Sequence, residues 1–315
     1  MKKIICFPRI ESVLIFDYAV CQIIHLKYWR YKLMLQVCMF SLFLETQVLF
    51  YSTRTLWNFC MNFLGERHLS QASKAIGQVS HSRKDWEHGR LFSLQDQIDH
   101  KIDFIKEELQ NIEIPIILVG HSIGSYISIE MFKKTLEKVN YCVGLYPFLT
   151  LNPHSTTQLI IAKIAQYQFV AAALSYLTAS LGFLPVKALR FIVGKSLGKS
   201  WSANAVEAAC SHLSQYHTMR NVLYMAMSEF KKLAEAPDWT FLRERKDQCA
   251  FLFGVGDHWG PLQLLEEISN QVPGIALSIE RENHTHGFCC TEAGSLWVAQ
   301  HVANLIKNQI ACTNQ

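Results

Sequence analysis

The clearest pattern of apolar and polar positions lies in the middle of the chain. Pro115 to Val119 is a short, largely β-branched apolar run, which predicts a buried strand. Ser125 to Lys134 follows closely and predicts a helix that carries Ile127, Ile129 and Met131. A buried strand leading into a helix is the repeating unit of α/β proteins.

Further elements are predicted on the N-terminal side of this unit. Val48 to Tyr51 and Ala75 to Ser80 are typical of strands, and Leu56 to Leu64 between them is typical of a helix. Ser93 begins another helix, because Ser-Leu-Gln-Asp resembles a capping box. Its apolar residues recur at helical spacing, at Leu94, Ile98, Ile102, Ile105 and Leu109.

The same alternation returns near the C-terminus. Cys249 to Gly254 and Ile275 to Ile279 predict strands, and a final helix is predicted around Ser295 to Ile306. Alternating strands and helices predict an α/β fold with a mostly parallel central sheet covered on both faces. A chain of 315 residues can hold one such domain with an insertion, or two smaller domains.

An insertion of about a hundred residues, between Tyr146 and Cys249, separates the two halves of this pattern. No aspartate or glutamate occurs from Lys138 through Val206, and Ile164 to Val186 carries no charge. Three interpretations of the uncharged stretch are open: a transmembrane helix, which Pro185 and several polar residues disfavour, a buried helical cap, or a hairpin or amphipathic helix lying in a lipid monolayer. Basic residues near anionic head groups suit the third, and they are Lys163, Lys187, Arg190, Lys195 and Lys199.

The first fifty residues predict less. Lys2 and Lys3 precede apolar residues, but Arg9 and Glu11 interrupt the run and no small-residue cleavage site follows, which disfavours a signal peptide. Leu33 to Leu44 is shorter than the ~20 residues needed to span a bilayer, so we interpret it as a buried or interfacial helix.

Composition narrows the classes of function. The formal net charge is only +4 and no basic stripe with interleaved aromatics is present, which argues against nucleic acid as a partner. Ten cysteines are scattered without CxxC pairs and predict reduced intracellular thiols instead of a disulfide framework or a zinc site. Half of the residues are apolar, enough for a large core and for some surface in contact with lipid.

The residues between the central strand and its helix, Gly120-His121-Ser122-Ile123-Gly124, form a Gly-x-Ser-x-Gly motif. Strand, motif and helix together are the context of a nucleophile elbow, in which a strained turn presents a serine hydroxyl above the sheet. The two glycines avoid side chains that would wedge strand and helix apart. Ser122 is therefore the candidate nucleophile, and His121 is expected to be a packed, hydrogen-bonded neighbour.

With this motif in place, the sequence resembles the lipid droplet-associated hydrolase family of α/β-hydrolases. The resemblance covers roughly residues 48 to 308. It is carried by Ser80-His81, the run from Leu91 to Lys101, the elbow extended through Ser125-Tyr126, and Leu145-Tyr146-Pro147. The resemblance implies a serine esterase of neutral lipids that resides on lipid droplets and endoplasmic reticulum.

A serine nucleophile needs a histidine to take its proton and a carboxylate to orient that histidine. In this fold they follow in the order serine, acid, histidine. Asp257 comes just after a late predicted strand and is the candidate acid, with a turn-forming aspartate as the other interpretation. His258 adjoins that acid, whereas His284 and His286 lie on the loop where the base is expected. His286-Gly-Phe is similar to the family's pattern and selects His286, with His284 as the alternative; a His-x-His metal pair lacks further ligands.

The oxyanion of acyl transfer needs two backbone N–H donors. Ile123, directly after the serine, is the first. The second comes from a glycine-rich loop, which in the family resembles Pro-Gly-Asn-Pro-Gly. Here the stretch after Val48 to Tyr51 reads Ser52-Thr53-Arg54-Thr55. This departure indicates either a divergent, weakly active member or an N-terminal region that derives from an altered transcript.

The expected organisation is an atypical segment (1–47), a first part of the hydrolase core (48–150), a helical cap or membrane-associating insertion (151–247) and a second part of the core (248–315). The expected function is a serine hydrolase of lipid esters, of the sterol ester or acylglycerol type, acting through Ser122, Asp257 and His286. No cofactor or metal is expected. The expected partners are the lipid ester and a droplet or membrane surface bound through 151–205.

Two other functions stay open. One is a lipid-droplet surface protein in lipid storage that keeps the fold but is catalytically impaired. The other is a soluble, cytosolic hydrolase of acyl thioesters or small esters, with the insertion as an ordinary cap.

Overall fold

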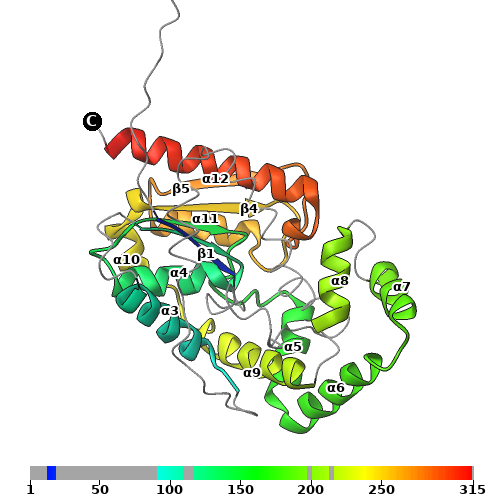
Figure 1. Cartoon of the computed structure of the whole chain (residues 1–315). Coiled ribbons are helices and arrows are strands. Elements are labelled where there is room, and N and C mark those ends of the chain that lie inside the picture. The colour runs from blue at the N-terminus through cyan, green and yellow to red at the C-terminus, as the bar shows by residue number, and fades with distance from the viewer. Residues whose placement is uncertain (1–12, 19–90, 109–115, 197–200, 213–215, 314–315) are drawn as a thin grey trace, which may run out of the picture.

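A single parallel sheet forms the centre of the molecule. The structure, a computed structural model, describes residues 13–18, 91–108, 116–196, 201–212 and 216–313. Within them, five parallel strands lie in the order β1-β2-β3-β4-β5 (Figure 1). The strands are β1 (Val13–Tyr18), β2 (Ile116–His121), β3 (Val139–Leu145), β4 (Cys249–Gly254) and β5 (Ala276–Glu280).

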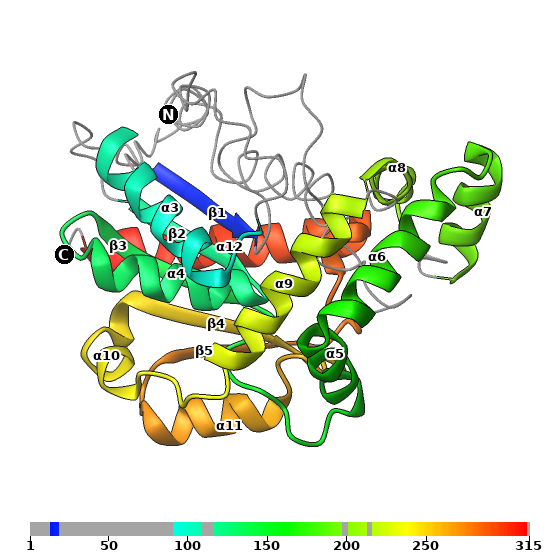
Figure 2. The ribbon, with the colours of Figure 1, turned by 90° about the horizontal axis from the view of Figure 1, so that it is seen from below.

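The central strands are apolar because both of their faces are covered. Every residue of β2 and of β4 is buried, as the continuous apolar runs predict. α3 (Leu94–Glu108) and α4 (Ile123–Lys134) lie on one side of the sheet, and α12 (Glu292–Thr313) crosses the other (Figures 1 and 2). α11 (Leu262–Gln271) packs beside β4. The predicted α/β-hydrolase architecture, a parallel sheet with helices on both faces and an inserted helical cap, is confirmed.

The capping box predicted at Ser93 is present at the start of α3. The Asp96 backbone N–H donates to Ser93 Oγ at 3.2 Å, and the Ser93 backbone N–H donates to the Asp96 carboxylate at 2.8 Å. The two residues thus satisfy donors at the start of the helix that have no partner within it. The apolar stripe of α3 faces the core, since Leu94, Ile98 and Ile105 are all buried.

The insertion between β3 and β4 is mainly helical in its described parts. Its helices are α5 (Thr156–Gln166), α6 (Gln168–Leu181), α7 (Val186–Ser196), α8 (Ala203–His212), α9 (Tyr216–Lys232) and α10 (Trp239–Glu244), followed by the 3₁₀ helix η4 (Lys246–Gln248). α5 and α6 pack on α9, and α7 packs on α8.

The uncharged stretch from Ile164 to Val186 is not one helix. It breaks at Tyr167, where the backbone is extended, and again between α6 and α7, so a continuous transmembrane helix is the wrong interpretation. No single helix in the described part of the chain is long and apolar enough to cross a membrane. α5 and α6 reach that length and composition only as a pair, with a 101° bend between them.

β1 belongs to the segment at 1–47, in which the sequence predicted no strand. It pairs with β2 from Val13 opposite Ile116 to Tyr18 opposite His121. The strands predicted at 48–51 and 75–80, and the helices predicted at 33–44 and 56–64, lie outside the described residues.

Candidate active site

Ser122 is the single residue between β2 and α4. β2 ends at His121 and α4 begins at Ile123, and Ser122 between them has φ 57°, in the left-handed region. Its backbone is held by the sheet, since the Ser122 N–H donates to the Leu145 carbonyl at 3.0 Å. The turn requires Gly120, because a Cβ there would lie 2.2 Å from the Gly124 carbonyl oxygen. This is the tight strand-to-helix turn of a nucleophile elbow.

Asp257 and His286 meet Ser122 at the carboxyl edge of the sheet. His286 Nε2 lies 2.9 Å from Ser122 Oγ, and His286 Nδ1 lies 3.0 Å from each carboxylate oxygen of Asp257. Asp257 follows β4, and His286 lies on the loop after β5. All three side chains are buried, which strengthens charge-assisted hydrogen bonds between them. Residues 164 positions apart in the chain are therefore joined in one hydrogen-bonded series.

Of the three histidines considered from the sequence, the structure brings His286 to the serine. His284 turns to a different carboxylate, with its Nδ1 3.3 Å from Glu280 Oε1. His258 contributes its backbone carbonyl, which accepts from the Gln158 side chain of α5. Since His284 and His286 face different acids, the two histidines do not converge on one point as metal ligands must.

His121 is a packed neighbour of this series. Its ring centroid lies 4.9 Å from those of His286 and Phe288, and 6.3 Å from that of Tyr146. Burial first, and then the nearby His286, hold the pKa of His121 well below its usual value. A neutral His121 does not compete with His286 for a proton from the serine.

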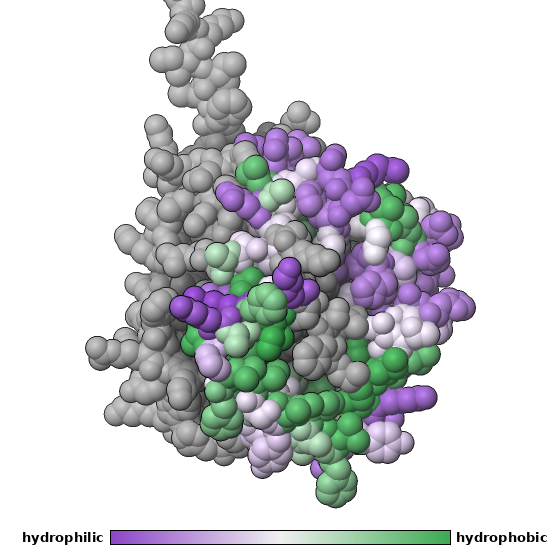
Figure 3. Space-filling view, turned by 90° about the vertical axis from the view of Figure 1, so that its right-hand side faces the viewer, coloured by the Kyte–Doolittle hydropathy of each residue, from purple (hydrophilic) through white to green (hydrophobic). Residues whose placement is uncertain are grey.

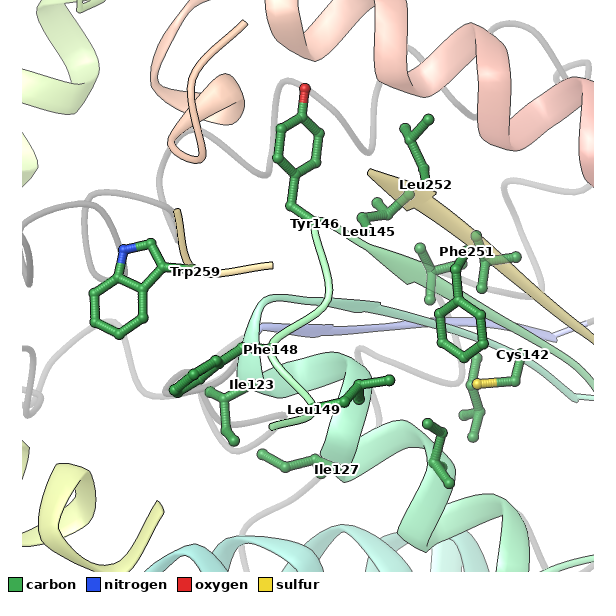
Figure 4. Close-up of a cluster of buried hydrophobic side chains, with 14 of the residues drawn as sticks. Ile123, Ile127, Cys142, Leu145, Tyr146, Phe148, Leu149, Phe251, Leu252 and Trp259 are labelled. Atoms are coloured by element: carbon green, nitrogen blue, oxygen red, sulfur yellow. The ribbon is translucent and has the colours of Figure 1, made fainter. Parts of the chain in front are cut away.

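The acid is oriented by Trp259, which lies two positions after it on the same loop. The Trp259 backbone N–H donates to Asp257 Oδ1 at 2.9 Å. The Trp259 ring lies 6.0 Å from that of His286 and 5.1 Å from that of Phe148. Figure 4 shows Tyr146 and Trp259 near the end of β3, with the Tyr146 ring rising on the side opposite Ile123 and Phe148.

Of the two expected oxyanion donors, only Ile123 lies among the described residues. Ile123 is the first residue of α4, where backbone N–H groups lack partners within the helix. The strand next to β2 on the side away from β3 is β1. The stretch at 52–55, expected to replace the glycine-rich loop, lies outside the described residues.

The sequence assigned no role to Glu280 or Tyr146, two buried residues near the site. Glu280 ends β5, fully buried, and accepts a hydrogen bond from the Tyr146 hydroxyl at 3.0 Å. A signal for Glu280 was available, because it is an acid at the carboxyl end of a strand adjacent to that of the candidate acid. Tyr146 was recognised as part of a motif but without a role.

The sequence is similar to that of one family along most of its length. The model of the family described as lipid-droplet associated hydrolase matches residues 54–289. A relative from Gallus gallus named lipid droplet-associated hydrolase is 28% identical over 201 residues, covering 63% of this chain and 60% of the relative. A relative of the same name from Dictyostelium discoideum is 25% identical over 269 residues, covering 80% of this chain and 85% of the relative.

The fold also has a counterpart among solved structures. The crystal structure of DBJA (mutant dbja delta) superposes with a TM-score of 0.57 at 10% sequence identity, covering 96% of this chain and 92% of that one. At such low identity the likeness concerns the fold alone.

Proposed function

The chain belongs to the lipid-droplet associated hydrolase family, and on that premise we propose that it is a serine hydrolase of lipid esters. We propose sterol esters or acylglycerols as substrates, the lipid droplet and the endoplasmic reticulum as the locations, and Ser122, His286 and Asp257 as the catalytic residues. The observation that carries the proposal is the hydrogen-bonded series from Ser122 through His286 to Asp257, with separations of 2.9 Å and 3.0 Å.

In the first half of the proposed reaction, Ser122 Oγ attacks the ester carbonyl carbon while His286 Nε2 takes the hydroxyl proton. The carboxylate of Asp257 stabilises the imidazolium that forms and keeps Nδ1 protonated beforehand. The backbone N–H of Ile123 donates to the developing oxyanion. When the tetrahedral intermediate collapses, His286 gives its proton to the leaving alcohol and the acyl group stays on Ser122.

The second half regenerates the enzyme with water. His286 removes a proton from water, whose oxygen attacks the acyl carbon, and the intermediate collapses to a free carboxylic acid as Ser122 Oγ recovers a proton from His286. Since each proton passes through His286, a neutral His286 is required at the start of each half. The low pKa of the adjacent His121 leaves this role to His286 alone.

A fluorophosphonate probe tests the proposed nucleophile, since the reagent reacts only with activated serines. We expect labelling of the wild type that disappears in Ser122→Ala. The matched control is Ser128→Ala, which removes a buried hydroxyl within α4, less than two helical turns after Ser122. Labelling that survives in Ser122→Ala, or no labelling of folded wild-type protein, would contradict the proposal.

Binding to a lipid surface is supported by the outer face of the cap. Figure 3 views the side that carries α6, α7 and α8 and displays a broad hydrophobic area there. Seven large apolar side chains of α5 to α7 and their connections are each more than 55% exposed, a set that we name the apolar face: Tyr167, Phe169, Tyr176, Leu177, Phe183, Val186 and Phe191. Exposed apolar groups in such number are typical of interaction sites.

Charge on the same helices suits an anionic surface. Lys163, Lys187 and Lys195 accompany the apolar face, and no acidic residue lies between Lys138 and Val206. Arg190 forms an ion pair with Glu207 of α8, so it is partly neutralised. Lysines beside exposed aromatic rings match the composition of helices that lie at the boundary of head groups and acyl chains.

A second candidate function rests on the same face. A surface protein of lipid droplets without turnover would need the apolar face but not the chemistry of Ser122. For variants expressed in cells, this candidate function predicts that deletion of residues 164–199 abolishes droplet targeting. It also predicts that Ser122→Ala leaves the cellular role intact. Loss of that role in Ser122→Ala would exclude this candidate, and a wholly cytosolic wild type would favour a soluble hydrolase of small esters.

A further inference from the structure

A second buried carboxylate lies behind the candidate base. Glu280 is the last residue of β5 and its side chain is fully buried. Its oxygens accept from the Tyr146 hydroxyl at 3.0 Å, from the His284 backbone N–H at 3.1 Å and from the Glu282 backbone N–H. His284 Nδ1 lies 3.3 Å from the same carboxylate. A buried polar side chain needs hydrogen-bond donors of this kind, because an unpaired polar group in the interior is costly.

The two contacts from backbone N–H groups fix the loop that carries His286. Glu282 and His284, whose N–H groups bind Glu280, flank Asn283, which has φ 62° in the left-handed region. The carboxylate therefore holds a tight turn that begins directly after β5 and ends two residues before His286. Without these hydrogen bonds, the loop would lose the contacts that offset its strained backbone.

The contact from the Tyr146 hydroxyl fixes the side chain that packs beside His286. The Tyr146 ring centroid lies 6.2 Å from that of His286 and 5.0 Å from that of Phe288. Burial first, and then Glu280, raises the pKa of Tyr146 far above its usual value, so the hydroxyl remains a donor. On its other side Tyr146 abuts β4, since a Cβ at Gly254 would lie 2.4 Å from the ring.

Two residues with strained backbones, Tyr146 and Asn283, are connected to the Glu280 carboxylate. Among the described residues, positive φ occurs at three that are not glycine: Ser122, Tyr146 and Asn283. The first is the candidate nucleophile, and the other two are the residue that donates to Glu280 and the centre of the turn that Glu280 holds. Strained conformations persist where the surroundings over-determine them, and they concentrate at functional sites.

We propose that Glu280 is a positioning residue for His286, acting through the 281–286 loop and through Tyr146. The inference rests on the proposed function, because it assigns Glu280 to the support of its general base. Asp257 orients the His286 ring through Nδ1, whereas Glu280 fixes where the loop places that ring. A misplacement of about 1 Å can cost about 100-fold in rate, so such support is measurable.

Three variants test the proposal by hydrolysis of p-nitrophenyl butyrate. Glu280→Gln keeps the volume but replaces one acceptor oxygen with an amino group that faces N–H donors. We expect kcat to fall by about 10- to 100-fold with KM within about twofold of the wild type. Tyr146→Phe should lower kcat less, and the double variant should be no slower than Glu280→Gln alone, because both changes break one network.

The control variant is Thr135→Val, which removes a buried hydrogen bond of 2.7 Å to the Met131 carbonyl. Thr135 caps the C-terminal end of α4, the end opposite Ser122. We expect this variant to lose stability while keeping its kcat. A fall in kcat equal to that of Glu280→Gln would show that loss of any buried hydrogen bond has this effect, and would overturn the proposal.

A spectroscopic readout is independent of turnover. The His286 Nδ1 proton shared with Asp257 should give a low-field proton NMR signal in the wild type, assigned by its loss in His286→Ala. We expect that signal to broaden or vanish in Glu280→Gln and to persist in Thr135→Val. An inactive wild type would refute the proposed hydrolase but leave this measurement decisive. An unchanged signal in folded Glu280→Gln would refute the role of Glu280 even in an active enzyme.

Discussion

The exposure of the apolar face of the cap predicts how strongly two of its side chains contribute to lipid binding. Phe169 and Phe183 protrude furthest from it, with 92% and 90% of their surfaces exposed. They lie at opposite ends of α6, one near its start and one just after its end. We expect Phe169→Ala combined with Phe183→Ala to weaken binding to droplets strongly while leaving the fold intact.

The magnitude follows from the area that each ring can bury. A phenylalanine buries about 200 Å² when covered, and about half of that at partial depth in a monolayer. At about 25 cal/mol per Å², each ring contributes about 2 kcal/mol after allowance for the alanine that replaces it. The pair therefore contributes about 4 kcal/mol, which is roughly a 10³-fold change in the binding constant. Both rings are exposed in the free protein, so the free energy of unfolding should change by less than about 0.5 kcal/mol.

Flotation with triolein droplets coated with phospholipid measures the binding. The control is Leu136→Ala, which removes a 42% exposed leucine between α4 and β3, outside the α5 to α7 segment that carries the apolar face. We expect the double variant to remain in the aqueous layer at lipid concentrations that float the wild type and the control. Equal flotation of all three proteins, with unchanged circular dichroism, would show that the cap does not contact lipid through this face.

Three further predictions concern the site and the core. Asp257→Asn should lower kcat for ester hydrolysis on the order of 10⁴-fold by favouring the wrong His286 tautomer, and a loss below tenfold would contradict its role. Gly120→Ala should destabilise the fold by about 3 kcal/mol in denaturant unfolding, because its Cβ meets the Gly124 carbonyl; an unchanged midpoint would contradict the tight elbow. Loss of hydration raises the pKa of Glu229 to about 8, so its contribution to stability is present below about pH 4.3 and is lost as the pH rises through 8. Melting temperatures at pH 5 and pH 8.5 should therefore differ less in Glu229→Gln than in the wild type, and an equal difference would contradict that pKa.

The elements near the candidate site could be predicted because their local signals agreed. The Cys249–Gly254 run was continuous and apolar, and the strand has those same bounds. Parallel strands place their carboxyl ends at one edge, so residues after β2, β4 and β5 had to be close in space whatever their separation in the chain. The choice of His286 over His284 came from a family pattern, and the structure brings His286 to Ser122 at 2.9 Å.

Other features had no local signal. β1 contains Asp17 and follows Arg9 and Glu11. Its apolar run is therefore short and interrupted by charges, which does not predict a core strand. The break at Tyr167 divides a stretch that carries no charge from Ile164 to Val186, so composition does not mark it. The contact between Tyr146 and Glu280 joins residues 134 positions apart and depends on side-chain direction, which periodicity does not encode.

The strained backbone at Ser122 and at Tyr146 is offset by the same sheet. The Ser122 N–H donates to Leu145 of β3, and the Tyr146 N–H donates at 2.7 Å to Leu252 of β4, so each strained residue is held by the next strand. Strain of about 1–3 kcal/mol at each position is compatible with folding only because the buried strands fix both ends. A change that loosens β3 against β4 would therefore act first on Tyr146, whose N–H donates to Leu252 of β4. The hydrogen bonds that join these strands therefore also fix the backbone of the proposed nucleophile and of Tyr146.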